Sequence, residues 1–370
     1  AYINKKWLDY LKLAVPNTTE ELEQVLIAFR DNADKLEQEF DIEGGVIPMS
    51  FIINNGDQDP AILINGFGEG YGDTGDHFAV KDDGTVIYTT VQEGYKEGIQ
   101  WLHQLVEEKL VDPEAFTQDW STYVAKGKNH RYGLCFSWDI ANIDNYEDYV
   151  MLPALAGPEG LVNITRQNGS ETSGFDRGRC VLTSNCRDTA LAAAWIDQMY
   201  NPIQSAQNNW GTYGEENSDN IFEMSTNADG GPMLRHMDLS GKSPVEIREN
   251  QSVNGPLAIL NEYYNVYVTE PDDAKWRLDN MHETYLSDMN SKYVFPNVFM
   301  SMEDTNRVSQ LDTDIKKYAE QMKASWILNG GIEEEWDGYL QKMEDYGLSE
   351  YLEIKQKYFD AYLDSLSKEK

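Results

Sequence analysis

Short apolar runs rich in β-favouring residues alternate along this chain with amphipathic segments, and this alternation restricts the fold more than any other feature. Apolar residues at helical spacing predict helices, whereas short apolar runs bounded by turn residues predict buried strands. Strands are expected at 46–53, 132–138 and 149–152, and a further one at Cys180 to Leu182. Strands that alternate with helices in this way are typical of an α/β architecture.

The helical spacing recurs from one end of the chain to the other. Helices are expected around Ile3 to Leu11, Leu22 to Phe29, Tyr95 to Val106 and Ala190 to Met199, and in the tail around Ile315 to Trp326, Trp336 to Met343 and Tyr351 to Tyr362. Trp195 and Trp326 fall on such apolar stripes, so both are predicted to lie in a core. Asn329-Gly330-Gly331 is expected to end one of the tail helices.

A glycine-rich stretch, NGFGEGYGDTG at 65–75, is predicted to be a loop beside something that requires close approach. Its last six residues match G-x-G-x-x-G, the pattern of a dinucleotide-binding loop. However, a hairpin is expected next, at 77–89 around Asp83-Gly84, where a dinucleotide site needs a helix. The acidic residues of the loop would also repel a phosphate. We therefore expect a loop at the rim of a cleft, and no nucleotide.

The chain carries 64 acidic and 30 basic residues in 370, a formal charge of −34. Proteins that bind nucleic acids or anionic membranes need clustered lysine and arginine, so both partners are disfavoured. No apolar run is long enough to span a bilayer. With 41% hydrophobic residues the chain can build sizeable cores, and its length predicts two domains.

Neither a catalytic site nor a metal site is evident from motifs. The five histidines are scattered, and no zinc-binding, nucleophile-elbow or P-loop motif occurs. We expect no catalytic residue, metal or other cofactor. Paired carboxylates such as Asp57 with Asp59 leave a glycoside hydrolase open as the alternative function. Of the three cysteines, Cys180 and Cys186 could form a bridge, but three free or buried thiols are the preferred reading.

The aromatic residues outside the helical stripes indicate a ligand. Sugar recognition uses flat aromatic faces against the C–H side of a pyranose, with carboxylates or amides for its hydroxyl groups. Aromatic residues beside polar partners occur here in loops and at strand ends: Phe67, Tyr71, Trp120, Trp138 with Asp139, and Trp210 with Tyr213 and Glu216. The alternative for each of these aromatic residues is that its side chain only anchors the loop in which it lies.

Several longer stretches, in order, resemble one family. They are YINKKWLDYLKLAVPNTTEELEQVLIAF, YKEGIQWLHQLVEEKLVDPEAFTQD, YVMLPALAGPEG, CVLTSNCRDTALAAAWIDQMYNP, WGTYGEE, WRLDNMHETY, FPNVFMSMED and the tail from Leu311. The chain is similar to the extracellular solute-binding proteins of family 1, the large, lipoprotein-type, sugar-binding components of ABC importers. The similarity extends over nearly the whole chain.

This resemblance implies a two-lobed, helix-rich, periplasmic-binding-protein-like α/β fold of class II, closing over a saccharide. The expected division is lobe 2, first part, at 1–178, a return segment of lobe 1 at 179–250, and the C-terminal helical part of lobe 2 at 251–370. The first part of one lobe is expected to be absent from this chain, together with a lipid anchor. Family members often carry a calcium-type loop where this chain reads RDNADKLEQEFDIEGG, so no calcium is expected there.

The resulting hypothesis is a monomeric, non-catalytic receptor outside a bacterial cell, in a Gram-positive organism, which passes an oligosaccharide to the transmembrane subunits of an ABC permease. The predicted ligand-binding residues are Trp138, Trp210, Tyr213, Trp120 and Phe67 for stacking, and Asp139, Glu216 and Arg177 for polar contacts. Arg177 or Arg179 could also meet a uronate. A peptide or lipid-like ligand, or a surface adhesin, remains a further alternative.

Overall fold

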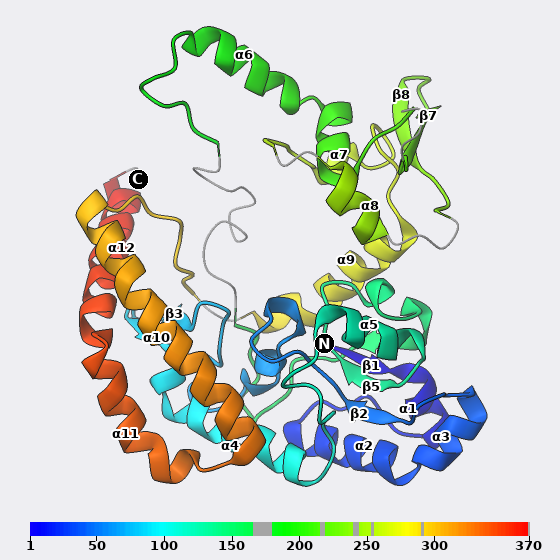
Figure 1. Ribbon diagram of the computed structural model, residues 1–370, viewed down its shortest axis with the longest axis vertical. Helices are drawn as coiled ribbons and strands as arrows, with labels where there is room; N and C mark the ends of the chain where they lie inside the picture. Colours follow the sequence, from blue (N-terminus) through cyan, green and yellow to red (C-terminus); the bar gives the residue numbers. More distant parts are fainter. Residues whose placement is uncertain (166–179, 215–218, 240–243, 253–254, 290–291, 369–370) are drawn as a thin grey trace. The chain divides into compact units, whose positions relative to one another are not determined.

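The computed structural model describes residues 1–165, 180–214, 219–239, 244–252, 255–289 and 292–368 (Figure 1). The chain forms two compact units. Unit 1 comprises Ala1–Phe175 and Asp279–Lys370, and unit 2 comprises Asp176–Leu278. The assignment of 1–178, 179–250 and 251–370 to two lobes stays a prediction.

Unit 1 is built on a four-stranded sheet. Its strands are β1 (Tyr2–Asn4), β2 (Ile47–Met49), β5 (Tyr132–Cys135) and β6 (Tyr149–Met151), in the order β2-β5-β1-β6. β2 is parallel to β5, and β1 is antiparallel to both β5 and β6, so β2, β5 and β6 run in one direction. Three expected strands are thus confirmed, although each is shorter than its apolar run.

The opening segment contains a strand as well as the expected helix. Ile3 lies in β1, and helix α1 (Lys5–Leu11) starts only after Asn4, whose side chain accepts a hydrogen bond from Trp7 N at 3.1 Å. The prediction of a helix at Ile3 was therefore wrong. An asparagine at the N-cap position ends the extended backbone and satisfies a free N–H group of the helix, which explains the boundary.

Further helices of unit 1 continue the α/β pattern. They are α2 (Thr19–Asp31), α3 (Ala33–Phe40), α4 (Glu93–Glu107) and α5 (Trp120–Lys128). Helix α2 begins at the cap Thr18, buries Leu22 and Phe29 on one face, and packs against β2. The helices predicted around Leu22 and Tyr95 are confirmed.

A separate hairpin follows the glycine-rich stretch, as the Asp-Gly signal predicts. Strands β3 (Phe78–Val80) and β4 (Val86–Tyr88) are antiparallel. Lys81 N donates to Thr85 O at 2.8 Å, and Gly84 has a φ of 93°, a conformation that favours glycine.

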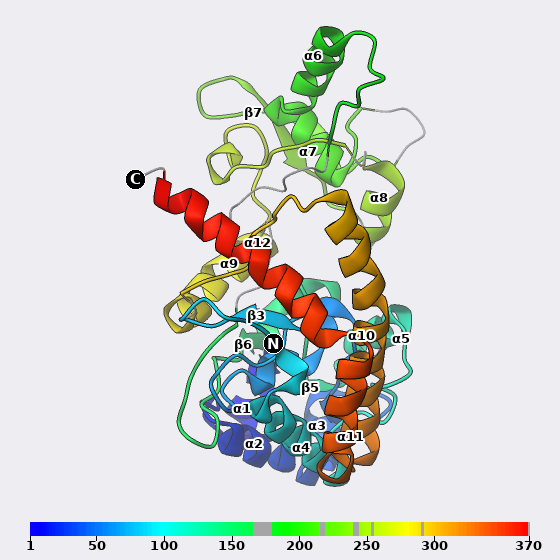
Figure 2. The same cartoon turned by 90° about the vertical axis from the view of Figure 1, so that its left-hand side faces the viewer.

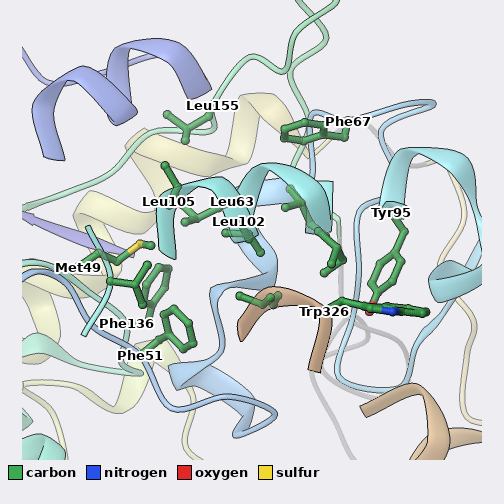
Figure 3. Close-up of a cluster of buried hydrophobic side chains, with 14 of the residues drawn as sticks. Met49, Phe51, Leu63, Phe67, Tyr95, Leu102, Leu105, Phe136, Leu155 and Trp326 are labelled. Atoms are coloured by element: carbon green, nitrogen blue, oxygen red, sulfur yellow. The ribbon is translucent and has the colours of Figure 1, made fainter. Parts of the chain in front are cut away.

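Three helices at the C-terminal end complete unit 1: α10 (Met302–Asn329), α11 (Ile332–Asp345) and α12 (Leu348–Lys368). α10 packs against α4, and α12 against α10 and β4 (Figures 1 and 2). Trp326 is fully buried in the resulting core, together with side chains from β2 and α4 (Figure 3). This confirms its predicted position, and α10 ends at Asn329 as expected.

Unit 2 is smaller and more loosely built. It contains α6 (Thr189–Met199), α7 (Pro202–Trp210), the antiparallel pair β7 (Phe222–Thr226) and β8 (Pro232–His236), and α8 (Pro244–Gln251). Helix α9 (Asp272–Tyr285) leads back to unit 1. No strand forms at Cys180 to Leu182, where no neighbouring strand is available for pairing among the residues described.

Trp195 is 60% exposed on α6, so its predicted place in a core was wrong for the described chain. The helix itself forms where the periodicity predicts it. The periodicity predicted the helix correctly, but the apolar stripe did not predict correctly that Trp195 is buried. Cys180 and Cys186 are both free thiols in this structure.

Candidate functional site

The carboxyl ends of β2, β5 and β6 meet at one edge of the unit 1 sheet. In open α/β sheets, ligands bind beyond this edge, because loops there can diverge around a ligand while the strands stay fixed. Two segments with aromatic and polar side chains leave the sheet at this point: Ser50 and Phe51 follow β2, and Phe136 to Asp139 follow β5. This sheet edge is the candidate site.

Trp138 stands at the end of β5 with 60% of its side chain exposed, in a unit whose other tryptophans are largely covered. Its backbone is held in place, since Trp138 O accepts a hydrogen bond from Tyr2 OH at 3.3 Å. An exposed indole on a fixed backbone loses little entropy on contact with a ligand, and its flat face suits a sugar ring.

Asp139, the neighbour of Trp138, is buried and has a structural task. Its Oδ1 accepts from Ala141 N at 3.0 Å and so caps the short 3-10 helix at Ile140–Asn142. Ser137 Oγ donates to Asp139 O at 2.8 Å. These bonds fix the turn that presents Trp138, whereas the predicted contact of Asp139 with sugar hydroxyl groups stays a prediction.

Trp120 is placed at the same edge by the start of α5. The preceding Asp119 caps this helix, accepting from Thr122 N at 2.8 Å. One turn into the helix, Tyr123 OH accepts from Phe136 N at 2.9 Å and lies 3.3 Å from Ser50 O. Tyr123 therefore ties α5 to the ends of both β5 and β2. Its ring centroid is 6.1 Å from that of Trp120, which is partly exposed.

Burial raises the pKa of Tyr123 well above its usual range, so this hydroxyl stays neutral at any physiological pH. A neutral hydroxyl can accept from the amide of Phe136 and donate to a carbonyl oxygen at once. The link between α5 and the strand ends is thus insensitive to pH over the working range.

A buried ion pair stabilises the segment that leads from β2 to this sheet edge. Lys126 Nζ lies 2.7 Å from Asp112 Oδ2 and 2.9 Å from Gln118 Oε1. Asp112 in turn accepts from Ser50 Oγ at 2.8 Å, and Gln118 Nε2 donates to Phe51 O at 2.8 Å. The charge of Lys126 is therefore compensated, and the same network fixes the segment that leaves β2. This network was not predicted from the sequence.

Phe67 lies in the core, not at the edge. Its side chain is 4% exposed, and its ring centroid is 5.7 Å from that of Trp101 (Figure 3). In this position it offers no open face to a ligand. Its role as a ligand-binding residue stays untested, and its packing accounts for its burial.

The glycine-rich stretch requires close approach of backbones, as predicted. A Cβ atom on Gly68 would lie 2.6 Å from Gly94 Cα, and one on Gly66 would lie 2.6 Å from Leu155 O. Side chains at these positions would collide with backbone that cannot move aside. The stretch is therefore packed against α4 and the segment after β6.

A second buried ion pair fastens this stretch to α10. Lys323 Nζ lies 2.7 Å from Asp59 Oδ1 and 3.2 Å from Asp73 Oδ2. Asp73 also contacts His77 Nδ1 at 2.9 Å and accepts from Thr89 Oγ1 at 2.7 Å. Burial alone would raise the pKa of Asp73, but the interactions with His77 and Lys323 outweigh it and hold that pKa well below its usual range.

The predicted residues of unit 2 pack within its own small core. The ring centroid of Trp210 lies 5.5 Å from that of His236 and 6.2 Å from that of Phe222. The backbone of Tyr213 pairs with that of Phe222 in an isolated parallel β-bridge, and Tyr213 is partly exposed. Glu216, Arg177 and Arg179 lie outside the described residues, so their predicted contacts stay predictions.

Within the described ranges, no group of three or more histidine, cysteine or acidic residues is arranged to hold a metal ion. The interval RDNADKLEQEFDIEGG forms the end of α2, all of α3 and the turn after it, not an extended loop. No helix among the residues described is long and apolar enough to cross a membrane.

No family model matches the chain. The chain is 44% identical over 363 residues to the fructooligosaccharide ABC transporter substrate-binding protein FusA of Streptococcus pneumoniae. This match covers 98% of the chain and 65% of that relative, so the chain spans just under two thirds of the relative's length.

Solved structures agree with this similarity. Structures of pneumococcal FusA in complex with kestose, and of its EF-hand mutant in complex with fructo-nystose, match with a TM-score of 0.86 and 44% identity. Each match covers 98% of this chain and 72% of the other. A solute-binding protein from Bifidobacterium longum infantis, described as HMO-binding, has the same fold at 23% identity and a TM-score of 0.74, covering 98% of this chain and 73% of its own.

Proposed function

The chain belongs to the extracellular solute-binding proteins of ABC transporters, and from this premise we propose that it binds a fructooligosaccharide for import without transforming it. The membership confirms the family resemblance seen in the sequence and the expected α/β solute-binding fold. One observation carries the proposal: 44% identity, over 98% of this chain, to a protein whose structures hold kestose and fructo-nystose.

The geometry of the sheet edge supports a sugar ligand. Trp138 and Trp120 are aromatic residues with exposed surface. The carbonyl oxygen of Trp138 accepts a hydrogen bond from Tyr2, and the helix that carries Trp120 is tied to the strand ends by Tyr123. We assign them the stacking role. Trp210 and Tyr213 are candidates from unit 2, since both keep part of their rings exposed. The polar roles of Asp139, Glu216 and Arg177 remain part of the proposal without support from the described contacts.

The proposed place of action is outside the cytoplasmic membrane of a Gram-positive bacterium; the similar protein FusA comes from Streptococcus pneumoniae. There the protein would act as a monomer and pass its ligand to the transmembrane subunits of an ABC permease. The charge of −34 is compatible with this, because fructooligosaccharides are uncharged and need no basic site.

Isothermal titration of the chain with kestose and nystose tests the proposal, with maltotriose as the control sugar. We expect saturable binding of the two fructose-containing sugars and weak or no binding of maltotriose. Chromatography of the same samples after prolonged incubation should return the sugars intact. Release of free fructose would favour the glycoside hydrolase alternative, and failure of both fructose-containing sugars to bind would overturn the ligand assignment.

A further inference from the structure

The two tryptophans assigned to stacking in unit 1 lie on different elements. Trp138 follows β5, whereas Trp120 is the first residue of α5. Two aromatic faces bind one oligosaccharide well only if their relative position is fixed before the ligand arrives, because ordering them on binding would reduce the affinity. The spacing of the two tryptophans therefore depends on what holds α5 against the end of β5.

Tyr123 connects these two elements directly. It lies on α5, three residues after Trp120, and is fully buried. Its hydroxyl oxygen accepts a hydrogen bond from Phe136 N at 2.9 Å and lies 3.1 Å from Phe136 O and 3.3 Å from Ser50 O. The one hydroxyl proton is donated to one of these two carbonyl oxygens at a time. Since Phe136 precedes Trp138 by two residues, the hydroxyl group holds the strand end that carries Trp138.

The backbone of Tyr123 is fixed to the same strand. Tyr132 OH donates to Tyr123 O at 2.9 Å, and the ring centroids of the two tyrosines lie 5.1 Å apart. Tyr132 is the first residue of β5, and Phe136 comes directly after its last residue. Tyr123 thus binds both ends of β5, so α5 cannot shift along this strand without breaking a buried hydrogen bond.

We propose that Tyr123 is a positioning residue for the ligand: its hydroxyl group fixes Trp120 relative to Trp138, and so raises the affinity for the sugar, without touching the sugar. This inference rests on the proposed binding of a fructooligosaccharide at the sheet edge. Tyr123 is 0% exposed, which excludes direct contact with a ligand. Removing the hydroxyl oxygen leaves the amide of the buried Phe136 without its acceptor. The backbone there then moves toward another acceptor, and Trp138 moves with it.

Hydrogen exchange measured without sugar tests the positioning by itself. Tyr123→Phe keeps the ring and its packing, and should accelerate exchange over 136–139 by about tenfold, the equivalent of one lost buried hydrogen bond. Tyr339→Phe is the matched control. Tyr339 is another buried tyrosine of unit 1, on α11, and its hydroxyl group lies 2.6 Å from Thr90 Oγ1. The control should leave exchange over 136–139 unchanged.

Titration with kestose tests the consequence for binding. The Kd should rise by about 3–10-fold in Tyr123→Phe, the cost of ordering one large side chain on binding, and stay the same in Tyr339→Phe. A double-mutant cycle with Trp120→Ala separates positioning from a merely structural role. Trp120→Ala should weaken binding less in the Tyr123→Phe background than in the native chain, whereas a structural role would leave the two losses additive.

Three results would overturn the proposal: unchanged exchange over 136–139 in Tyr123→Phe, an unchanged Kd for kestose, or additive losses in the cycle. Failure of the proposed function gives a different pattern. If the native chain binds neither kestose nor nystose, the sugar assignment fails, and the positioning of Trp138 by Tyr123 is then decided by the exchange over 136–139 alone.

Discussion

Replacing Lys323 by methionine should destabilise unit 1 strongly while changing its shape very little. Methionine can occupy the space of the aliphatic part of the lysine, so the loss is mainly that of the charge. Lys323 is 2% exposed, and its Nζ contacts Asp59 at 2.7 Å and Asp73 at 3.2 Å. Removing one partner of a buried ion pair costs about 3–5 kcal/mol, because the remaining charge is left in a medium that solvates it poorly.

This loss can be measured by urea denaturation followed by far-UV circular dichroism at pH 7. At about 2–4 °C per kcal/mol for a unit of this size, the Tm should also fall by about 6–20 °C. Lys317→Met is the matched control, since Lys317 is an exposed lysine of the same helix. We expect its effect to stay within about 0.5 kcal/mol.

The pH dependence gives the same prediction a second readout. The folded pKa of Asp73 lies well below that of an unfolded aspartate, about 3.9, so its ion pairs contribute fully above that value. This contribution is lost as the pH falls through the folded pKa. The stability difference between the native chain and Lys323→Met should therefore shrink as the pH falls below about 4. A loss below about 1 kcal/mol at pH 7, or a difference that does not change with pH, would refute the reasoning.

Three other predictions follow from the structure. Trp138→Ala should weaken kestose binding by about 1–3 kcal/mol in titration calorimetry with no change in urea midpoint. The control Phe299→Ala, which removes another exposed aromatic side chain of unit 1, should bind normally, and unchanged affinity of Trp138→Ala would remove Trp138 from the site. Gly94→Ala places a Cβ 2.7 Å from Gly68 Cα and should lower the free energy of unfolding by about 1–3 kcal/mol, measured by thermal unfolding. Gly75→Ala serves as its control, because a Cβ there meets nothing within 4 Å. Equal Tm values for the two variants would contradict the close packing. Burial lowers the pKa of His236 to about 4, below its unfolded value of about 6.5, so its contribution to the stability of unit 2 is present above pH 6.5 and declines toward pH 4. The protection factors of the β8 amides, which correct for the pH dependence of the chemical exchange rate, should therefore fall on acidification, and fall less in His236→Phe.

Local patterns predicted the secondary structure of unit 1 well because each element is specified by its own residues. The cap at Thr18, the Asp83-Gly84 turn and the Gly330 stop all act within a few residues of the boundary they set. The strand at Tyr2–Asn4 was missed for the opposite reason. Three residues carry no periodicity of their own, and β1 exists because β5 and β6 lie on either side of it.

Neither buried ion pair was predicted, although the sequence contains an indication of each. Lys323 falls on the apolar stripe of α10, four residues after Ala319 and four before Ile327, where a solvated lysine is not expected. Lys126 likewise follows the buried Tyr123 by three residues. A lysine on a buried face implies a carboxylate opposite it. Which carboxylate it meets, Asp73 from the glycine-rich stretch or Asp112 before α5, depends on contacts far apart in the chain.

The predictions for the two tryptophans that were expected in a core had different outcomes for the same reason: burial depends on contacts with residues far apart in the chain. Trp326 and Trp195 stand on helices with equally clear apolar faces, and only Trp326 is buried. An apolar face predicts that another element packs against the helix, since exposed leucine and tryptophan side chains do not stabilise a helix that stands alone. It does not record which element covers it. For Trp326 the covering residues lie in α4 and α11, within this chain. For Trp195, the described core of unit 2 is formed by α7, the β7–β8 hairpin and α8 and includes no residue of α6, so an apolar helix face alone does not decide between burial and exposure.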